Sequence, residues 1–346
     1  MTRIERFAKK LNAAGLDAGL VTNLINIRYL TGFTGSNAVL LVSSSADVTL
    51  ATDGRYHKQI VDQTGQQAII SAETLDAMAE HLKGTVGFEA GNMSVAAFRR
   101  LDELTSAKLV PMETIVERLR EVKDEGEIAL IEQACEISVA ALRGLLAGPF
   151  VGRTEREVAR DLEWRIFELG AEALAFETIC AAGENSAIPH HHPTDRLIAK
   201  GDLLKIDFGA RLAGYHADFT RTFVIGPPAD WQKEIHQAVK DAQAAGVAAL
   251  EFGAEFRSSR VAVDNSLGSW GEHFKTGLGH GVGLEIHEDP HLRLTNTGTV
   301  VPRIALTVEP GIYLGDRGGV RIEDTLLTTD STPRVLTEFE RDLLEL

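Results

Sequence analysis

The chain has 346 residues, and 35 lysines and arginines against 50 aspartates and glutamates give it a net charge of −15. A strongly acidic chain repels phosphate backbones and anionic lipids, so we expect neither nucleic acid nor a membrane surface as a partner. Two cysteines cannot form a disulfide framework, and no apolar run reaches the ~18 residues of a membrane helix. Together these features favour a cytoplasmic protein.

The N-terminal third of the chain alternates short apolar runs with helical patterns. Strand-like runs occupy residues 18–21, 39–42, 48–52, 68–70 and 85–88, and helical patterns occupy residues 4–11, 74–82 and 95–104. Such alternation predicts a small α/β domain. A charged stretch at 117–127 marks its end, so we predict domains at 1–122 and 123–346.

The rest of the chain alternates predicted helices with predicted strand pairs. Apolar residues recur at steps of three and four from 128 to 145, and a capping box at Thr154 and Glu157 opens a helix that ends at Gly170. A third helix begins near Asp230. Residues 203–224 and 306–328 each predict two strands around a turn, and this order would allow two structural halves.

Asp207 and Asp218 lie on either side of Gly214 in the first strand pair. In a hairpin that turns at residues 212–213 they would stand opposite each other, and their carboxylates would meet. A buried pair of like charges is costly unless a cation neutralises it. The alternative is a pair of solvated aspartates that flank a turn.

The second strand pair repeats this acidic pattern with Glu309 and Glu323, across a turn-rich segment at 316–319. Arg321 would face the same way as Glu323 on a strand. His280 lies among glycines in Gly-Leu-Gly-His-Gly-Val-Gly, which permit close backbone approach. Four carboxylates and one histidine suit two divalent cations, because the four negative charges balance the charge of the two ions. A water between two such ions is a ready nucleophile.

Two histidine-rich segments admit other interpretations. His287-Glu-Asp-Pro-His291 matches the zinc-protease pattern H-E-x-x-H, but that pattern requires a helix, which Pro290 would break. His190 is followed by His191 and His192, and for these last two the alternative is a loop of surface histidines.

Taken together, these residues resemble the pita-bread metallopeptidases (family M24B), and within them the branch of Xaa-Pro aminopeptidase (aminopeptidase P) and Xaa-Pro dipeptidase (prolidase). The matching stretches are Asn185-Ser-Ala-Ile-Pro-His190, Asp207-Phe-Gly, Asp218-Phe-Thr-Arg-Thr222, Gly279-His-Gly-Val-Gly-Leu-Glu-Ile-His-Glu288, Glu309-Pro-Gly-Ile-Tyr313 and Arg321-Ile-Glu-Asp-Thr325. Residues 26–35 and 52–56 are more loosely similar to the family's creatinase-type domain. The resemblance implies a small creatinase-like α/β domain followed by a pita-bread α+β catalytic domain.

The resemblance also implies a ligand set for two divalent metal ions. Asp207 would bind one metal, Asp218 and Glu323 would bridge both, and His280 and Glu309 would complete the second. Mn²⁺ is the expected metal, and Co²⁺ or Zn²⁺ also fits these ligands.

Four residues acquire catalytic roles from the same resemblance. Glu309 would also handle the proton of the bridging water, and Arg321 would support the metal carboxylates. His190 and His287 would hydrogen-bond the substrate and stabilise the tetrahedral intermediate.

The implied activity is that of a metal-dependent, proline-specific exopeptidase. We expect an aminopeptidase that removes the N-terminal residue from peptides with proline in second position, by attack of a metal-bridging hydroxide. A homodimer is the family expectation.

Other activities of this fold remain as alternatives. The first is an Xaa-Pro dipeptidase, in which His291 and Arg293 would bind the free proline carboxylate, but the N-terminal segments look more like aminopeptidase P. A metal-free peptide- or protein-binding relative is the alternative from a different class, and the five intact ligand positions disfavour it. A methionine aminopeptidase is disfavoured because such enzymes generally lack this N-terminal domain.

Overall fold

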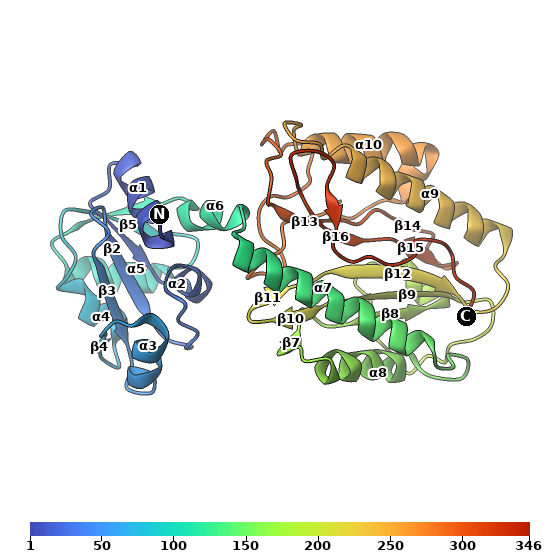
Figure 1. Cartoon of the computed structure of the whole chain (residues 1–346), viewed down its shortest axis with the longest axis horizontal. Coiled ribbons are helices and arrows are strands. Elements are labelled where there is room, and N and C mark those ends of the chain that lie inside the picture. The colour runs from blue at the N-terminus through green and yellow to red at the C-terminus, as the bar shows by residue number, and fades with distance from the viewer. The chain divides into compact units, whose positions relative to one another are not determined.

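The computed structural model describes all residues from 1 to 346, which form two compact units, Met1–Arg120 and Glu121–Leu346. The first unit is α/β and the second is α+β, as the sequence predicted (Figure 1). No helix combines the length and apolar character needed to span a membrane.

The first unit is built on one mixed sheet with the strand order β4-β3-β2-β1-β5-β6. Its strands are β1 (Ala18–Val21), β2 (Val39–Ser43), β3 (Val48–Thr52), β4 (Ile69–Ile70), β5 (Thr85–Glu89) and β6 (Lys108–Met112). Its helices are α1 (Arg3–Ala13), α2 (Leu24–Thr31), α3 (His57–Thr64), α4 (Thr74–Ala79) and α5 (Val95–Leu104), and α6 (Ile115–Glu121) follows β6. Leu20, Leu41 and Val86 from the sheet pack with Met78 and Leu101 from the helices.

Several elements of the first unit were missed in the sequence. Strand β6 contains Pro111, which argues against a strand, but β6 is an edge strand, where proline is tolerated at positions whose N–H would face solvent. Helix α2 has only eight residues and relies on the side chain of Asn23, which accepts hydrogen bonds from the N–H groups of Ile25 and Asn26.

The second unit contains four long helices and eleven short strands. The helices are α7 (Glu125–Leu146), α8 (Glu155–Glu168), α9 (Asp230–Ala248) and α10 (Arg257–Leu267), with 3₁₀ turns η1 (Gly183–Ala187) and η2 (Gly268–His273). The strands are β7 (Ala173–Leu174), β8 (Ile179–Ala182), β9 (Leu203–Phe208), β10 (Ala210–Leu212), β11 (Tyr215–His216), β12 (Phe219–Val224), β13 (Ala305–Val308), β14 (Gly311–Tyr313), β15 (Gly319–Arg321), β16 (Asp324–Leu327) and β17 (Arg334–Val335).

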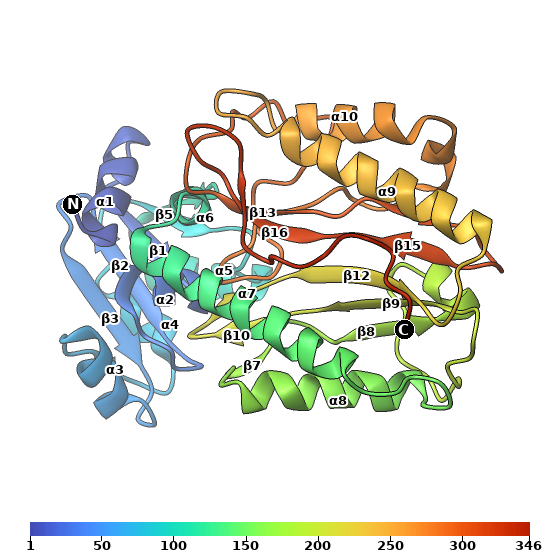
Figure 2. The same ribbon diagram turned by 45° about the vertical axis from the view of Figure 1, so that its right-hand side comes forward.

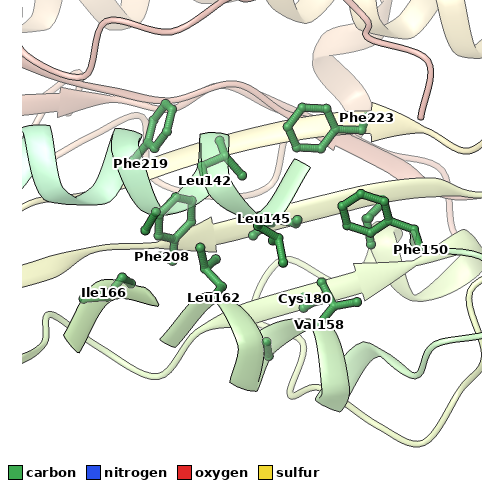
Figure 3. Packing of buried hydrophobic residues seen from close by; sticks show 14 of the residues in the cluster. Leu142, Leu145, Phe150, Val158, Leu162, Ile166, Cys180, Phe208, Phe219 and Phe223 are labelled. Atoms are coloured by element: carbon green, nitrogen blue, oxygen red, sulfur yellow. The ribbon is translucent and has the colours of Figure 1, made fainter. Parts of the chain in front are cut away.

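These elements form two halves, each with a helix pair packed on strands. Figure 2 shows α7 and α8 on one side of the strands and α9 and α10 on the other. In the first half, Leu142 and Leu162 of the helices meet Phe208, Phe219 and Phe223 of β9 and β12 in a buried cluster (Figure 3). Burying side chains of this size contributes about 1.5–3 kcal/mol each.

The first strand pair is a long hairpin whose register differs from the prediction. Thr220, not Asp218, lies opposite Asp207. The turn lies at Ala213 and Gly214, with φ of 47° and 83°, one residue later than predicted. A two-residue hairpin turn of this type requires positive φ at both positions, and glycine meets that requirement best. Asp218 is therefore a diagonal neighbour of Asp207.

The second strand pair joins the first through one backbone bridge, between Thr220 and Glu323. Val308 pairs with Asp324 and Gly311 pairs with Arg321, so the same register places Glu309 across from Glu323. Of the acidic residues, Asp207 lies within β9, and Asp218, Glu309 and Glu323 lie within two residues of strand ends in the middle of the unit.

Candidate active site

A cavity of about 320 Å³ opens where the two hairpins meet. Its walls include all five predicted metal ligands and the three further residues predicted to assist them: Asp207, Asp218, His280, Glu309, Glu323, His190, His287 and Arg321. Phe176, Glu177 and Ile179 also line the cavity. These three residues carry no motif, and only the folded chain places them beside the acidic cluster.

The imidazole of His280 lies among the carboxylates. Its Nε2 is 3.4 Å from Asp218 Oδ2 and 3.5 Å from Glu309 Oε1. Its Nδ1 is 3.1 Å from the carbonyl oxygen of Gly281, so Nδ1–H donates there and Nε2 faces the acidic groups. Ligand atoms of Asp218, His280 and Glu323 all lie within 4.8 Å of one another.

Two buried carboxylate oxygens of the cluster, Asp207 Oδ1 and Glu323 Oε1, have no hydrogen-bond partner. A buried acceptor without a donor is destabilising, and an ionised carboxylate is more so. Oxygen ligands and one imidazole are a donor set that divalent transition metals accept. The residues present therefore fit a pair of divalent cations.

The pKa values of the cluster show the same excess of negative charge. Burial raises the pKa of Glu323 well above its usual range, and the charges of Asp218 and Glu309 raise it further. Burial also raises the pKa of Glu309 to about 7, although His280 opposes the rise. Burial raises the pKa of Asp218 to about 6 against its hydrogen bond with His280. A bound cation reverses these shifts by favouring the ionised carboxylates.

Arg321 orients two of the carboxylates. Its side chain is 2% exposed, and its Nη2 forms an ion pair with Asp207 Oδ2. Its Nε donates to Thr220 Oγ1 over 3.1 Å, and Thr220 Oγ1 donates to Glu323 Oε2 over 2.6 Å. Tyr313 accepts a third hydrogen bond from Arg321 Nη1, at 3.0 Å. Arg321 thus fixes Asp207 directly and Glu323 through Thr220.

The close backbone approach predicted for the glycines around His280 is present. A Cβ on Gly279 would lie 2.0 Å from the carbonyl oxygen of Thr307, and one on Gly281 would lie 2.3 Å from that of Asp289. The Thr307 N–H donates to the carbonyl oxygen of His280 over 2.8 Å. Strand β13 therefore holds the His280 segment directly.

His287 packs edge-on against His280, with ring centroids 4.3 Å apart. Burial lowers the pKa of His287 to about 4, and the neighbouring His280 adds to this shift. The ring is neutral at pH 7, so one nitrogen donates a hydrogen bond and the other accepts one. Residues 287–291 are not helical, which excludes the zinc-protease interpretation of this segment.

The other predicted substrate contacts are placed differently. His291 and Arg293 do not line the cavity, and Arg293 is exposed. His191, for which a surface position was an alternative, is buried, and its Nε2 lies 2.8 Å from Glu155 Oε2. His192 does lie at the surface, 3.3 Å from a carboxylate oxygen of Glu177. Unlike His291 and Arg293, both His191 and His192 line the cavity.

A largely buried set of four carboxylates and one histidine between two helix-and-strand halves defines a pita-bread metallohydrolase. Residues 129–330 match metallopeptidase family M24 and residues 3–122 match the creatinase/prolidase N-terminal domain, so the chain belongs to the M24 metallopeptidases.

Similar proteins cover the whole chain. A protein of Pyrococcus furiosus named Xaa-Pro dipeptidase is 34% identical over 99% of both chains. The structure of an Xaa-Pro dipeptidase from Bacillus anthracis matches with a TM-score of 0.95 at 35% identity, over 99% of both chains. The structure of an X-Pro aminopeptidase from Thermotoga maritima matches with a TM-score of 0.91 at 34% identity, over 100% of both chains. The chain is therefore a metal-dependent, proline-specific exopeptidase.

Proposed function

We propose that the protein hydrolyses the peptide bond between an N-terminal residue and a proline in second position. The observation that carries this proposal is the cavity, which combines a buried carboxylate cluster with an apolar wall. Phe176 and Ile179 form that wall. A pyrrolidine ring is apolar and has no N–H to satisfy, so it fits such a surface.

Asp207, Asp218, His280, Glu309 and Glu323 would hold two divalent cations. When bound, these ions supply charge that polarises the scissile carbonyl and lowers the pKa of a water molecule. Asp218 and Glu323 would contact both ions, and Arg321 keeps Asp207 and Glu323 in their orientations.

The remaining steps belong to the side chains of the cavity. Glu309 takes the proton of the attacking water at a carboxylate oxygen and passes it to the proline nitrogen, which leaves as an amine. His287 donates a hydrogen bond from its neutral ring to the carbonyl oxygen as negative charge develops there. His190, which is exposed in the cavity wall, also contacts the substrate.

For substrate length, the cavity supports an aminopeptidase that accepts peptides longer than two residues. A dipeptidase must bind the free carboxylate of the proline, and a lysine or arginine usually does so. No lysine lines the cavity, and its one arginine, Arg321, already contacts Asp207, Thr220 and Tyr313. Of the histidines beside His190 in the wall, His191 contacts Glu155 and His192 contacts Glu177. A second candidate, an Xaa-Pro dipeptidase, is favoured by the names of the similar proteins from Pyrococcus furiosus and Bacillus anthracis.

Two matched substrates test the proposal, an Xaa-Pro dipeptide and an Xaa-Pro-Xaa tripeptide, each incubated with Mn²⁺ and followed by product analysis. We expect a free N-terminal residue from the tripeptide and little from the dipeptide, and the reverse preference would establish the second candidate. Asp218→Ala should abolish hydrolysis, whereas Asp230→Ala, which changes an exposed aspartate, should not. No cleavage of either substrate by the parent would leave a metal-free binding protein. The preference for Mn²⁺, the homodimer and the cytoplasmic location stay predictions.

A further inference from the structure

Glu155 is a buried carboxylate outside the cavity that no step of the proposed reaction uses. It occupies the first position of α8, and it is 0% exposed. Its Oε1 accepts hydrogen bonds from the Ala182 N–H at 2.8 Å and from Asn185 Nδ2 at 2.9 Å. Its Oε2 is 2.8 Å from His191 Nε2, and Thr194 donates to it from N at 3.0 Å and from Oγ1 at 2.7 Å.

These contacts enclose one loop, residues 185–194. Asn185 lies before His190, and His191 and Thr194 lie after it, so a single carboxylate ties both sides of the loop together. The backbone adds to this: the N–H of Arg156, in the first turn of α8, donates to the carbonyl oxygen of Thr194 over 3.1 Å. One of the free N–H groups of the helix start is thereby satisfied by the same loop.

Two buried basic side chains hold the loop just before His190. Lys205 Nζ donates to the carbonyl oxygen of Ile188 over 2.6 Å, and Arg321 Nη1 donates to that of Pro189 over 3.2 Å. His190 itself is exposed into the cavity, and no hydrogen bond holds its ring. The place of its imidazole therefore depends on the loop.

We propose that Glu155 is the positioning residue that holds His190 in place beside the substrate. The inference rests on the proposed function, in which His190 contacts the substrate. Burial alone would raise the pKa of Glu155, but its hydrogen bonds, the one from Ala182 first, outweigh this and lower it. The carboxylate is ionised at neutral pH and acts only as an acceptor, so the proton of His191 lies on Nε2.

Replacing this carboxylate with an amide tests the role with little change in shape. In Glu155→Gln an NH₂ group must face either the two donors at Oε1 or the three at Oε2, so the donors on that side lose their acceptor and the loop must shift. Glu157→Gln is the matched control, because Glu157 lies in the same helical turn and is exposed. Each variant is first checked for helix content and for bound Mn²⁺ per chain, which should equal those of the parent.

The deciding measurement is a double-mutant cycle on kcat and KM for the Xaa-Pro-Xaa tripeptide with His190→Ala. We expect Glu155→Gln to lower kcat at least tenfold in the parent and less than twofold in the His190→Ala background, with Glu157→Gln unchanged. An equal loss in both backgrounds, or no loss in the parent, would overturn the positioning role while leaving the proposed function intact. A harmless His190→Ala would instead overturn the role given to His190, and with it this inference.

Thr194→Val provides a milder variant if Glu155→Gln folds poorly. It removes the hydroxyl donor at 2.7 Å, together with the acceptor of the Arg196 N–H at 3.2 Å, and leaves the charge of Glu155 in place. The same cycle applies: a loss of kcat that disappears in the His190→Ala background supports the role, and a loss that persists there contradicts it.

Discussion

Gly279→Ala should separate two of the proposed metal ligands without changing any ligand. The new Cβ would lie 2.0 Å from the carbonyl oxygen of Thr307, so the two backbones must move apart by about 1.4 Å to reach the 3.4 Å of ordinary contact. The same pair of segments carries His280 and Glu309, whose Nε2 and Oε1 atoms are 3.5 Å apart. A shift of this size exceeds the tolerance of a metal site, where ligand distances vary by about 0.2 Å.

We expect Gly279→Ala to lower Mn²⁺ affinity at least tenfold and hydrolysis about a hundredfold, since a 1 Å misplacement alone costs about that much. The overpacking should also cost about 1–3 kcal/mol of folding free energy. Gly277→Ala is the control from the same glycine run, because nothing lies within 4 Å of its Cβ. Titration calorimetry with Mn²⁺ and tripeptide hydrolysis measure both effects, and equal metal affinity in the two variants would refute the steric argument.

Three further predictions concern buried polar groups. Arg321→Lys keeps the charge but loses the fork that contacts Asp207, so metal affinity measured by calorimetry should fall about 10–100-fold; unchanged affinity would contradict that role. Asp324→Asn disturbs a carboxylate that accepts hydrogen bonds from four side chains, and it should lower the free energy of unfolding in urea by about 3–5 kcal/mol. Asp330→Asn, which changes an exposed aspartate, should lower it by almost nothing. Burial lowers the pKa of His236 to about 4, and the positive charge of Lys240 contributes to this shift. The folded state thus disfavours the protonated ring, and up to about 3 kcal/mol of stability present above pH 6.5 is lost as the pH falls to 4. His236→Gln should flatten that part of a stability-against-pH curve, and an unchanged slope would show that other groups cause it.

The sequence predicted the acidic cluster because its residues break a strong local rule. Aspartate and glutamate within apolar strands are costly, and both hairpins show the same exception. The register of the first hairpin was wrong because the positive φ of Ala213, which fixes the turn, has no clear sequence signal. The error of one residue at the turn moved Asp218 from opposite to diagonal, which kept it near Asp207.

The apolar wall and the positioning carboxylate could not be predicted in the same way. Phe176 and Ile179 look like ordinary core residues, and only tertiary packing places them beside the cluster. Glu155 follows the N-cap of a helix, where an acidic residue is common, so its sequence context gave no reason to expect burial. The burial of His191 could not be predicted either, because its partner Glu155 is distant in sequence.

The central claim is that five side chains hold two divalent cations on which hydrolysis depends. Metal-free protein titrated with Mn²⁺, with binding by calorimetry and tripeptide hydrolysis followed on the same samples, tests it most directly. We predict two ions bound per chain, activity that rises with their occupancy, and loss of both in Asp218→Asn. Hydrolysis that persists in the presence of a chelator, or Mn²⁺ binding by Asp218→Asn equal to that of the parent, would contradict the account.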